Sequence, residues 1–284
     1  MGCPTYHRSC VYNRYRCPPL TRSEPSQDPG PIFVVGCPRS GTSMMQWALR
    51  AHPQVWGSAE SDFLVPLISG VKEAHDFGIV RGRMHWLVRE SVERAELLAA
   101  VGSGIDSLFR SRSGGLRWVE QTPLYTLHLD DLAEMFPDAR FVAMVRDGRS
   151  VVHSLMHFVE PVPHRAACRT FAKYTQAVLD FASGQQSDRM MLVRYEDAVS
   201  RPTEVLADIA SFVDLPHDPA CGDYISTQKP INSSFSEPEG DQPRWRSWTP
   251  PMFKYFGAVA GRNQEQLGYD DTAPDRPSAL FLKR

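Results

Sequence analysis

The segment PIFVVGCPRSGTSMMQWAL, residues 31–49, decides the fold of this chain. Its first part, residues 32–35, is an unbroken apolar run, which is typical of a strand buried on both faces of a parallel sheet. The glycine-bounded stretch from Gly36 to Gly41 follows, and apolar residues then recur at helical spacing through Leu49. The segment therefore predicts a strand, a glycine loop and a helix in direct succession.

Three further apolar runs extend this pattern along the chain. They occupy residues 116–119, 140–145 and 190–193, and each is followed by a polar turn and a helical segment. Buried strands that alternate with helices indicate a parallel sheet covered on both sides. We therefore expect an α/β fold of the P-loop type, with a central parallel sheet flanked by helices.

The segments between these runs are expected to be mostly helical. Residues 62–112 favour a helical insertion that includes a helix over residues 83–100. A helix is also predicted over residues 203–213. The stretch from 214 to 251 is crowded with Pro, Ser, Gly and Asp, so we expect a long loop that acts as a lid or is disordered. A final helix over residues 251–266 closes the domain.

Length and composition describe an ordinary globular protein. The chain has 284 residues, of which 42% are hydrophobic and 23% charged, and a formal net charge of −2. This charge excludes a general attraction to nucleic acid or anionic membrane, so any anion binding must be local. We expect a flexible N-terminal extension over residues 1–30, one domain over 31–270 and a C-terminal tail over 271–284.

The N-terminal extension carries three cysteines and no targeting pattern. Cys3, Cys10 and Cys17 recur every seven residues, a spacing that matches neither a zinc site nor a secreted disulfide framework. We interpret them as free thiols. No run is apolar enough to span a membrane, and the first residues lack the apolar core of a signal peptide. We therefore expect a cytoplasmic chain.

The glycine loop has the chemistry of an anion-binding site. Gly36 and Gly41 have P-loop spacing, and a helix N-terminus follows them. Thr42 stands where nucleotide triphosphatases carry a lysine for the β- and γ-phosphates, so a kinase or ATPase is disfavoured. Arg39 instead places a forked cation inside the loop. The alternative is a glycine-rich turn that merely joins a strand to a helix.

The same segment resembles the 5′-phosphosulfate loop of sulfotransferases that use 3′-phosphoadenosine 5′-phosphosulfate (PAPS), in the branch that includes the tyrosylprotein enzymes. The resemblance implies that PAPS is the co-substrate. It also implies that the 5′-phosphosulfate binds to a continuous set of loop residues, namely Arg39, Ser40, Gly41, Thr42 and Ser43. Arg39 is further expected to contribute to catalysis.

A second motif lies downstream. FVAMVRDGRSVVHSLM, residues 141–156, is similar to the 3′-phosphate segment of the same family, and the resemblance assigns the phosphate contacts to Arg146 and Ser154. An arginine at the carboxyl end of a parallel strand lies where such sheets bind ligands. The alternative is a surface turn formed by Asp147 and Gly148. Arg149 could pair with Asp147 or face the ligand, and both options stay open.

The catalytic base is expected just after the glycine-loop helix. AHPQVWGSAESDF, residues 51–63, resembles the segment in which the tyrosylprotein branch carries a glutamate base, and an ungapped count from Arg39 places that glutamate at Glu60. A solvated loop carboxylate is the alternative. Asp62 is the second candidate for the base, and it stands where the tyrosylprotein enzymes carry an arginine.

The sequence departs from the family pattern at two other positions. WVEQTP, residues 118–123, has Gln121 where the family ordinarily presents a lysine that stabilises the leaving group. A neutral amide can donate a hydrogen bond but no charge, so Arg39 or an arginine from the late loop should carry more of that role. Phe158 stands where the tyrosylprotein enzymes place an additional arginine near the 3′-phosphate.

Two C-terminal segments add candidate nucleotide contacts. VRYEDAV resembles a family segment whose tyrosine contacts the nucleotide, which corresponds to Tyr195, although a half-buried aromatic at a strand end has the same appearance. PRWRSW resembles the family's Arg-Trp-Arg that closes over the donor. It makes Arg244 and Arg246 candidate ligands, and Trp245 is equally compatible with a core anchor.

These observations predict a PAPS-dependent sulfotransferase that needs no metal and acts on a hydroxyl. The acceptor stays open among carbohydrates, small molecules, lipids and tyrosine, and the absence of an acceptor-side arginine favours sugars or small molecules. The residue 62–112 insertion is expected on the acceptor side. A P-loop kinase of a small hydroxyl compound and a non-catalytic nucleotide-binding module are the alternatives. The sequence does not indicate an oligomeric state.

Overall fold

The computed structural model describes residues 29–227 and 243–269 of the chain. Cys3, Cys10 and Cys17, together with both expected terminal segments, lie outside the described residues, so the expected domain boundaries stay predictions. Within the described ranges, no helix is long and apolar enough to cross a membrane.

Five parallel strands form the central sheet, in the order β2-β3-β1-β4-β5. The strands are β1 (Ile32–Gly36), β2 (Val55–Gly57), β3 (Arg117–Glu120), β4 (Arg140–Val145) and β5 (Met190–Arg194). Strand β1 pairs with β4 along its whole length, from Ile32 opposite Arg140 to Gly36 opposite Met144. It is fully buried, as its unbroken apolar sequence predicts.

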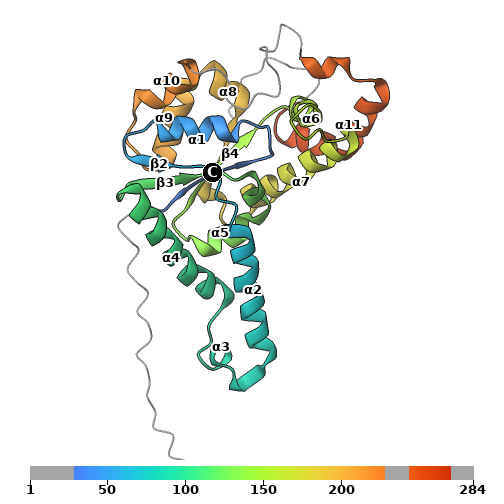
Figure 1. Ribbon diagram of the computed structural model, residues 1–284. Helices are drawn as coiled ribbons and strands as arrows, with labels where there is room; N and C mark the ends of the chain where they lie inside the picture. Colours follow the sequence, from blue (N-terminus) through green and yellow to red (C-terminus); the bar gives the residue numbers. More distant parts are fainter. Residues whose placement is uncertain (1–28, 228–242, 270–284) are drawn as a thin grey trace, which may run out of the picture.

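Helices cover both faces of the sheet (Figure 1). Side chains of β1 alternate between two cores, with Phe33 and Val35 on one face and Ile32 and Val34 on the other. Helices α1 (Thr42–Arg50), α9 (Pro202–Phe212) and α10 (Pro219–Thr227) contribute to the second core. The first core receives side chains from α5 (Leu129–Met135), α6 (Gly148–Met156), α7 (His164–Ser183) and α11 (Pro250–Gln266).

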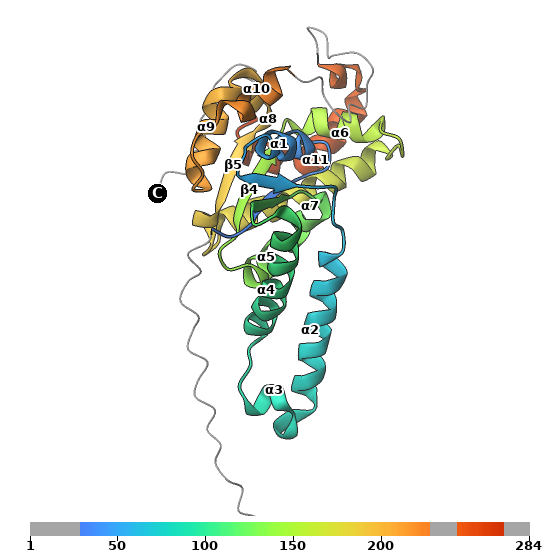
Figure 2. The same ribbon diagram turned by 60° about the vertical axis from the view of Figure 1, so that its left-hand side comes forward.

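A helical arm projects from this body (Figure 2). It consists of α2 (Leu64–Val80), a 3₁₀ turn η1 (Gly82–Met84), the short helix α3 (Trp86–Arg89) and α4 (Arg94–Ser113). Helix α4 returns to the body, where Gly102 packs against the backbone of Met135 in α5. The arm is the insertion that the sequence places between the first two apolar runs.

The structure corrects three expectations about secondary structure. Residues 55–57 form the edge strand β2, which the sequence analysis did not predict. The single helix expected over residues 83–100 is broken between α3 and α4, where Ser91 adopts a left-handed φ of 56°. Helix α10 lies within the stretch expected to be a long loop, because its Pro219 is compatible with the first turn of a helix.

The remaining elements connect or extend these layers. They are α8 (Tyr195–Ser200) and the 3₁₀ helices η2 (Pro123–His128), η3 (Ser187–Arg189) and η4 (Arg244–Ser247). Residues 228–242 of the predicted lid lie outside the described residues.

The close contact between α4 and α5 predicts different outcomes for two alanine substitutions in one helix. A Cβ atom at Gly102 would meet the carbonyl oxygen of Met135, whereas a Cβ atom at Gly104 meets open space. Gly102→Ala should therefore lower the free energy of unfolding by about 1–3 kcal/mol. Gly104→Ala should raise it by up to about 1 kcal/mol, because alanine favours the helix. Urea denaturation measures both, and equal effects would contradict the described packing.

Candidate functional site

The ends of the five strands bring the candidate residues to one edge of the sheet. Because all strands are parallel, the segments that follow them lie on the same side. In spatial order from β2 to β5, each strand is followed within three residues by one candidate: Glu60, Gln121, Arg39, Arg146 and Tyr195. The base candidate and the 3′-phosphate candidate therefore lie on opposite sides of the glycine loop.

The glycine loop has a backbone conformation that few side chains tolerate. Gly36 and Gly41 have φ angles of 146° and 99°, and Arg39 also has a positive φ of 75°. A left-handed φ at a non-glycine residue costs free energy and is concentrated at functional sites. Gly41 is the N-cap residue of α1, and it has no side chain with which to cap the helix. The first-turn amide groups of α1 are therefore suited to bind an anion.

The two arginines that follow β1 and β4 contact each other. Nη1 of Arg146 donates a hydrogen bond to the carbonyl oxygen of Arg39 at 3.2 Å. Burial lowers the pKa of Arg39, and the positive charge of Arg146 lowers it further. The two positive charges repel each other, and an anion placed against both would relieve this repulsion.

Ser154 on α6 and Phe158, just after this helix, both contact Arg39 of the glycine loop. Nε of Arg39 donates to Oγ of Ser154 at 3.1 Å, so the loop arginine contacts the serine assigned to the other phosphate. The guanidinium of Arg39 also lies over the ring of Phe158, 4.3 Å from its centre. Phe158, which replaces an arginine of the tyrosylprotein branch, thus supports the position of Arg39 through a cation–π contact.

Arg149 forms an ion pair with Asp147. Its Nη2 lies 2.7 Å from Oδ2 of Asp147, and its guanidinium stacks over Trp245 at 4.1 Å from the ring centre. The structure therefore favours the first of the two options that the sequence left open. Trp245 packs at the edge of the core, which supports its interpretation as an anchor.

The ring of Tyr195, directly after β5, packs against the glycine loop. Its ring lies beneath the guanidinium of Arg146 at 4.1 Å, and it approaches Gly41 so closely that a Cβ atom there would lie 2.5 Å from it. Only glycine fits beneath this ring. Tyr195 thus connects β5 to both expected phosphate sites.

Glu60 lies on the loop that follows β2. Nε2 of Gln46 in α1 donates to the carbonyl oxygen of Ser58 at 3.0 Å and ties this loop to the glycine-loop helix. Glu60 is an exposed residue, as the alternative of a solvated loop carboxylate predicts, but partial burial still raises its pKa and the charge of Asp62 raises it further. The Gln121 amide opposes this rise, although its Nε2 meets no hydrogen-bond acceptor within the described residues.

A buried carboxylate that sequence reasoning missed holds the Glu60 loop in place. Oε1 of Glu120 accepts hydrogen bonds from the amide and the hydroxyl of Ser61, both at 2.9 Å, and from the hydroxyl of Thr122 at 2.8 Å. The hydroxyl of Ser61 also bonds to that of Tyr125, which accepts from the amide of Leu64. The only sequence signal for Glu120 is its position at the end of an apolar run.

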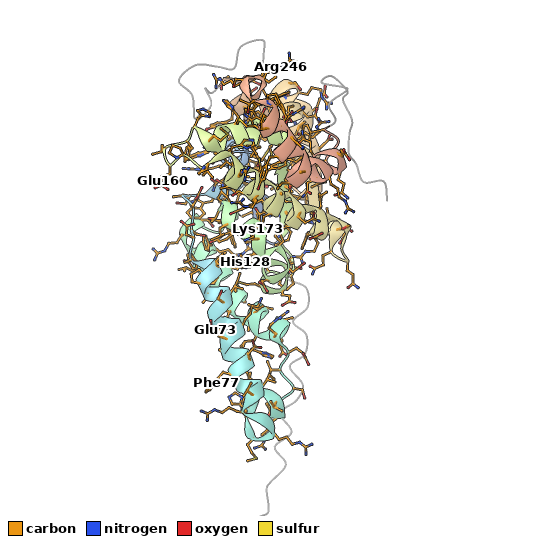
Figure 3. The ribbon with its side chains drawn as sticks, turned by 90° about the vertical axis from the view of Figure 1, so that its right-hand side faces the viewer. Glu73, Phe77, His128, Glu160, Lys173 and Arg246 are labelled. Atoms are coloured by element: carbon orange, nitrogen blue, oxygen red, sulfur yellow. The ribbon has the colours of Figure 1, made fainter. Side chains whose placement is uncertain are left out.

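The late-loop arginines lie on η4, at the opposite end of the molecule from the arm in Figure 3, where Arg246 is labelled. Arg246 is exposed and Arg244 is half-buried. The neighbouring Trp248 anchors this segment, because its Nε1 donates to Nδ1 of His153 at 3.2 Å.

Two buried polar atoms near the glycine loop are suited to bond a ligand. Oγ of Ser40 in the glycine loop and Nε2 of Gln121 after β3 have no hydrogen-bond partner in the described part of the chain. Both residues are 1% exposed. Unpaired buried polar atoms are costly, and they are found where a ligand or water completes them. These groups are therefore suited to an anion with several oxygen atoms, next to a carboxylate of raised pKa.

Comparison with known proteins identifies related chains. The protein-tyrosine sulfotransferase of Drosophila melanogaster is 26% identical over 81% of this chain, and the putative protein-tyrosine sulfotransferase of Caenorhabditis briggsae is 28% identical over 65% of it. The chain spans about half of the fly protein (48%) and 65% of the nematode protein.

Solved structures of low identity share the fold. The sulfotransferase domain of the Synechococcus PCC 7002 olefin synthase has a TM-score of 0.58 and 21% identity, and covers 88% of this chain and 99% of its own. The sulfotransferase domain of the Curacin biosynthetic pathway has a TM-score of 0.57 and 19% identity, with coverages of 86% and 99%. The Sulfotransferase family model matches residues 31–219, and the chain therefore belongs to the sulfotransferase family.

Proposed function

We propose that this protein transfers a sulfuryl group from PAPS to a hydroxyl acceptor. The observation that carries this proposal is the contact between two arginines that follow adjacent strands, Arg39 in the glycine loop and Arg146 at the end of β4. Family membership supports the reaction class, and the named relatives are described as sulfotransferases.

The residues present suit an adenosine nucleotide with phosphates at both ends of its ribose. The glycine loop and the N-terminus of α1 would hold the 5′-phosphosulfate, and the unpaired Oγ of Ser40 is placed to bond one of its oxygens. Arg146 and Ser154 would hold the 3′-phosphate. Arg39 lies between the two groups, because it contacts both the Arg146 guanidinium and the Ser154 hydroxyl.

Transfer needs a base for the acceptor proton and positive charge at the leaving group. In the proposed step the acceptor oxygen forms a bond to sulfur, the bond from sulfur to the 5′-phosphate oxygen breaks, and the acceptor proton moves to Glu60. The products are the sulfated acceptor and adenosine 3′,5′-bisphosphate. A raised pKa makes Glu60 a stronger base than an ordinary carboxylate.

Arg39 is the cation proposed to stabilise the leaving phosphate, since Gln121 supplies no charge. The unpaired Nε2 of Gln121 can still donate a hydrogen bond to a sulfuryl oxygen. A neutral donor stabilises developing negative charge less than a lysine does. The reaction proposed here therefore depends more on Arg39 than on the residue after β3.

The acceptor side carries negative charge. Burial and the charge of Asp62 raise the pKa of Glu60, and burial raises the pKa of Glu120 with a further contribution from the charge of Glu60. An acidic peptide would be repelled there, so we propose a neutral hydroxyl compound such as a sugar or another small molecule. Turnover assays with labelled PAPS should detect sulfation of neutral acceptors; exclusive sulfation of an acidic tyrosine peptide would contradict this preference.

Loss of the guanidinium after β4 should weaken nucleotide binding. Arg146→Ala should reduce affinity for adenosine 3′,5′-bisphosphate roughly tenfold to a hundredfold, because a hydrogen bond to a charged group contributes about 1.5–3 kcal/mol. Isothermal titration calorimetry measures this change. Arg112→Ala, at an exposed position on α4, is the matched control and should bind like the wild type. Equal affinities of all three proteins would remove Arg146 from the donor site.

The ionisation of Glu60 should determine how turnover depends on pH. Because proton transfer needs ionised Glu60, kcat should rise with pH through its raised pKa. Asp62→Asn removes a charge that raises this pKa, so the acidic limb of the profile should move to lower pH. Asp130→Asn, an exposed change on α5, should leave the profile in place.

Glu60→Gln tests the same assignment by removing the base. Turnover should fall by roughly 10² or more, while affinity for adenosine 3′,5′-bisphosphate stays within about twofold. A Glu60→Gln variant that turns over like the wild type would show that another group accepts the proton.

A further inference from the structure

The far end of the helical arm exposes apolar side chains that the fold does not use. Val80 is 86% exposed, Met84 84%, Trp86 64%, Phe77 59% and Ile79 46%. We call residues 77–89, which contain all five, the arm tip. Single exposed apolar residues are common, but a contiguous group marks a binding surface.

The arm tip has its own small packed centre, and the exposed residues are not part of it. Leu87 is the buried residue of α3, and it packs with His85 against Gly78 of α2. Nδ1 of His85 accepts a hydrogen bond from the amide of Leu87 at 3.3 Å and caps α3. Nε2 of His75 lies 3.1 Å from the carbonyl oxygen of Val92 and holds the two sides of the arm together. Packing and hydrogen bonds within the tip therefore fix the backbone that carries the exposed apolar side chains.

The charge of the arm tip has one sign. Its thirteen residues, FGIVRGRMHWLVR, include Arg81, Arg83 and Arg89 and no acidic residue, although the whole chain has a net charge of −2. All three arginines are exposed. Acidic residues begin outside the tip, at Asp76 and Glu90. A local excess of positive charge thus coincides with the exposed apolar side chains.

The position of the tip makes it accessible to a broad surface. Figure 2 shows α3 at the extremity of the arm, remote from the sheet, and Figure 3 labels Phe77 near the same end. Arginine and tryptophan side chains suit the boundary between water and lipid, because each combines an apolar body with a polar end. Anionic lipids attract basic residues with about 1 kcal/mol each.

We propose that the arm tip docks this protein onto a bilayer surface that contains anionic phospholipid. Val80, Met84 and Trp86 would enter the boundary between headgroups and acyl chains, and the arginines would lie among the lipid phosphates. A second copy of the chain is a poorer occupant. Two identical tips would bring six arginines together with acidic residues only at the margins, at Asp76 and Glu90, and interface centres are depleted in charge.

Vesicle sedimentation with the full chain tests this inference. The wild type should bind to vesicles of phosphatidylcholine mixed with phosphatidylserine more strongly than to phosphatidylcholine alone, and added salt should weaken that binding. Val80→Ser and Trp86→Ser should each reduce binding roughly tenfold. The double variant R81E/R83E should reduce binding to the mixed vesicles by roughly tenfold or more.

Val199→Ser is the matched control, because it makes the same chemical change at a 49% exposed valine on α8. It should bind vesicles like the wild type, and thermal melting should show that all variants are folded. Failure of the wild type to bind mixed vesicles, or equal binding by Val80→Ser and Val199→Ser, would overturn the proposal. A dimer in sedimentation velocity that Trp86→Ser dissociates, without vesicle binding, would assign the tip to contact between chains instead.

Discussion

Parallel pairing of five strands is the constraint on which the site depends. Every strand must end at the same edge of the sheet, and the strand order β2-β3-β1-β4-β5 then fixes the order of the residues that follow. Glu60 and Gln121 come to one side of the glycine loop, and Arg146 and Tyr195 to the other. Residues that are far apart in the chain thus come to one edge of the sheet, with a carboxylate on one side of the glycine loop and cations in and beyond the loop.

Several local free-energy costs of the fold lie at this edge of the sheet. Arg39 has a left-handed backbone, burial and the charge of Arg146 lower the pKa of Arg39, and the buried polar atoms of Ser40 and Gln121 have no partner in the described ranges. Such costs persist where the rest of the structure holds the residues in place and where the binding of a ligand offsets the lost free energy. One anionic ligand with several oxygens would relieve the repulsion and pair the unpaired atoms at the same time.

The sequence predicted what depends on local pattern and missed what depends on tertiary contact. Strands β1, β3, β4 and β5 were predictable because continuous apolar runs mark strands buried on both faces. The edge strand β2 has three residues and no such run. Glu120 was missed because a buried carboxylate looks like an exposed one in sequence, and only its bonds to Ser61 and Thr122 reveal its role. Glu60 as the base, and the nucleotide contacts as a group, stay predictions.

A crystal structure of the chain with adenosine 3′,5′-bisphosphate tests the central claim most directly. The account predicts one nucleotide across the carboxyl ends of the strands, with its 5′-phosphate against the glycine loop and its 3′-phosphate against Arg146 and Ser154. A nucleotide bound away from the carboxyl ends of the strands, or one that contacts Arg39 and leaves Arg146 untouched, would contradict it.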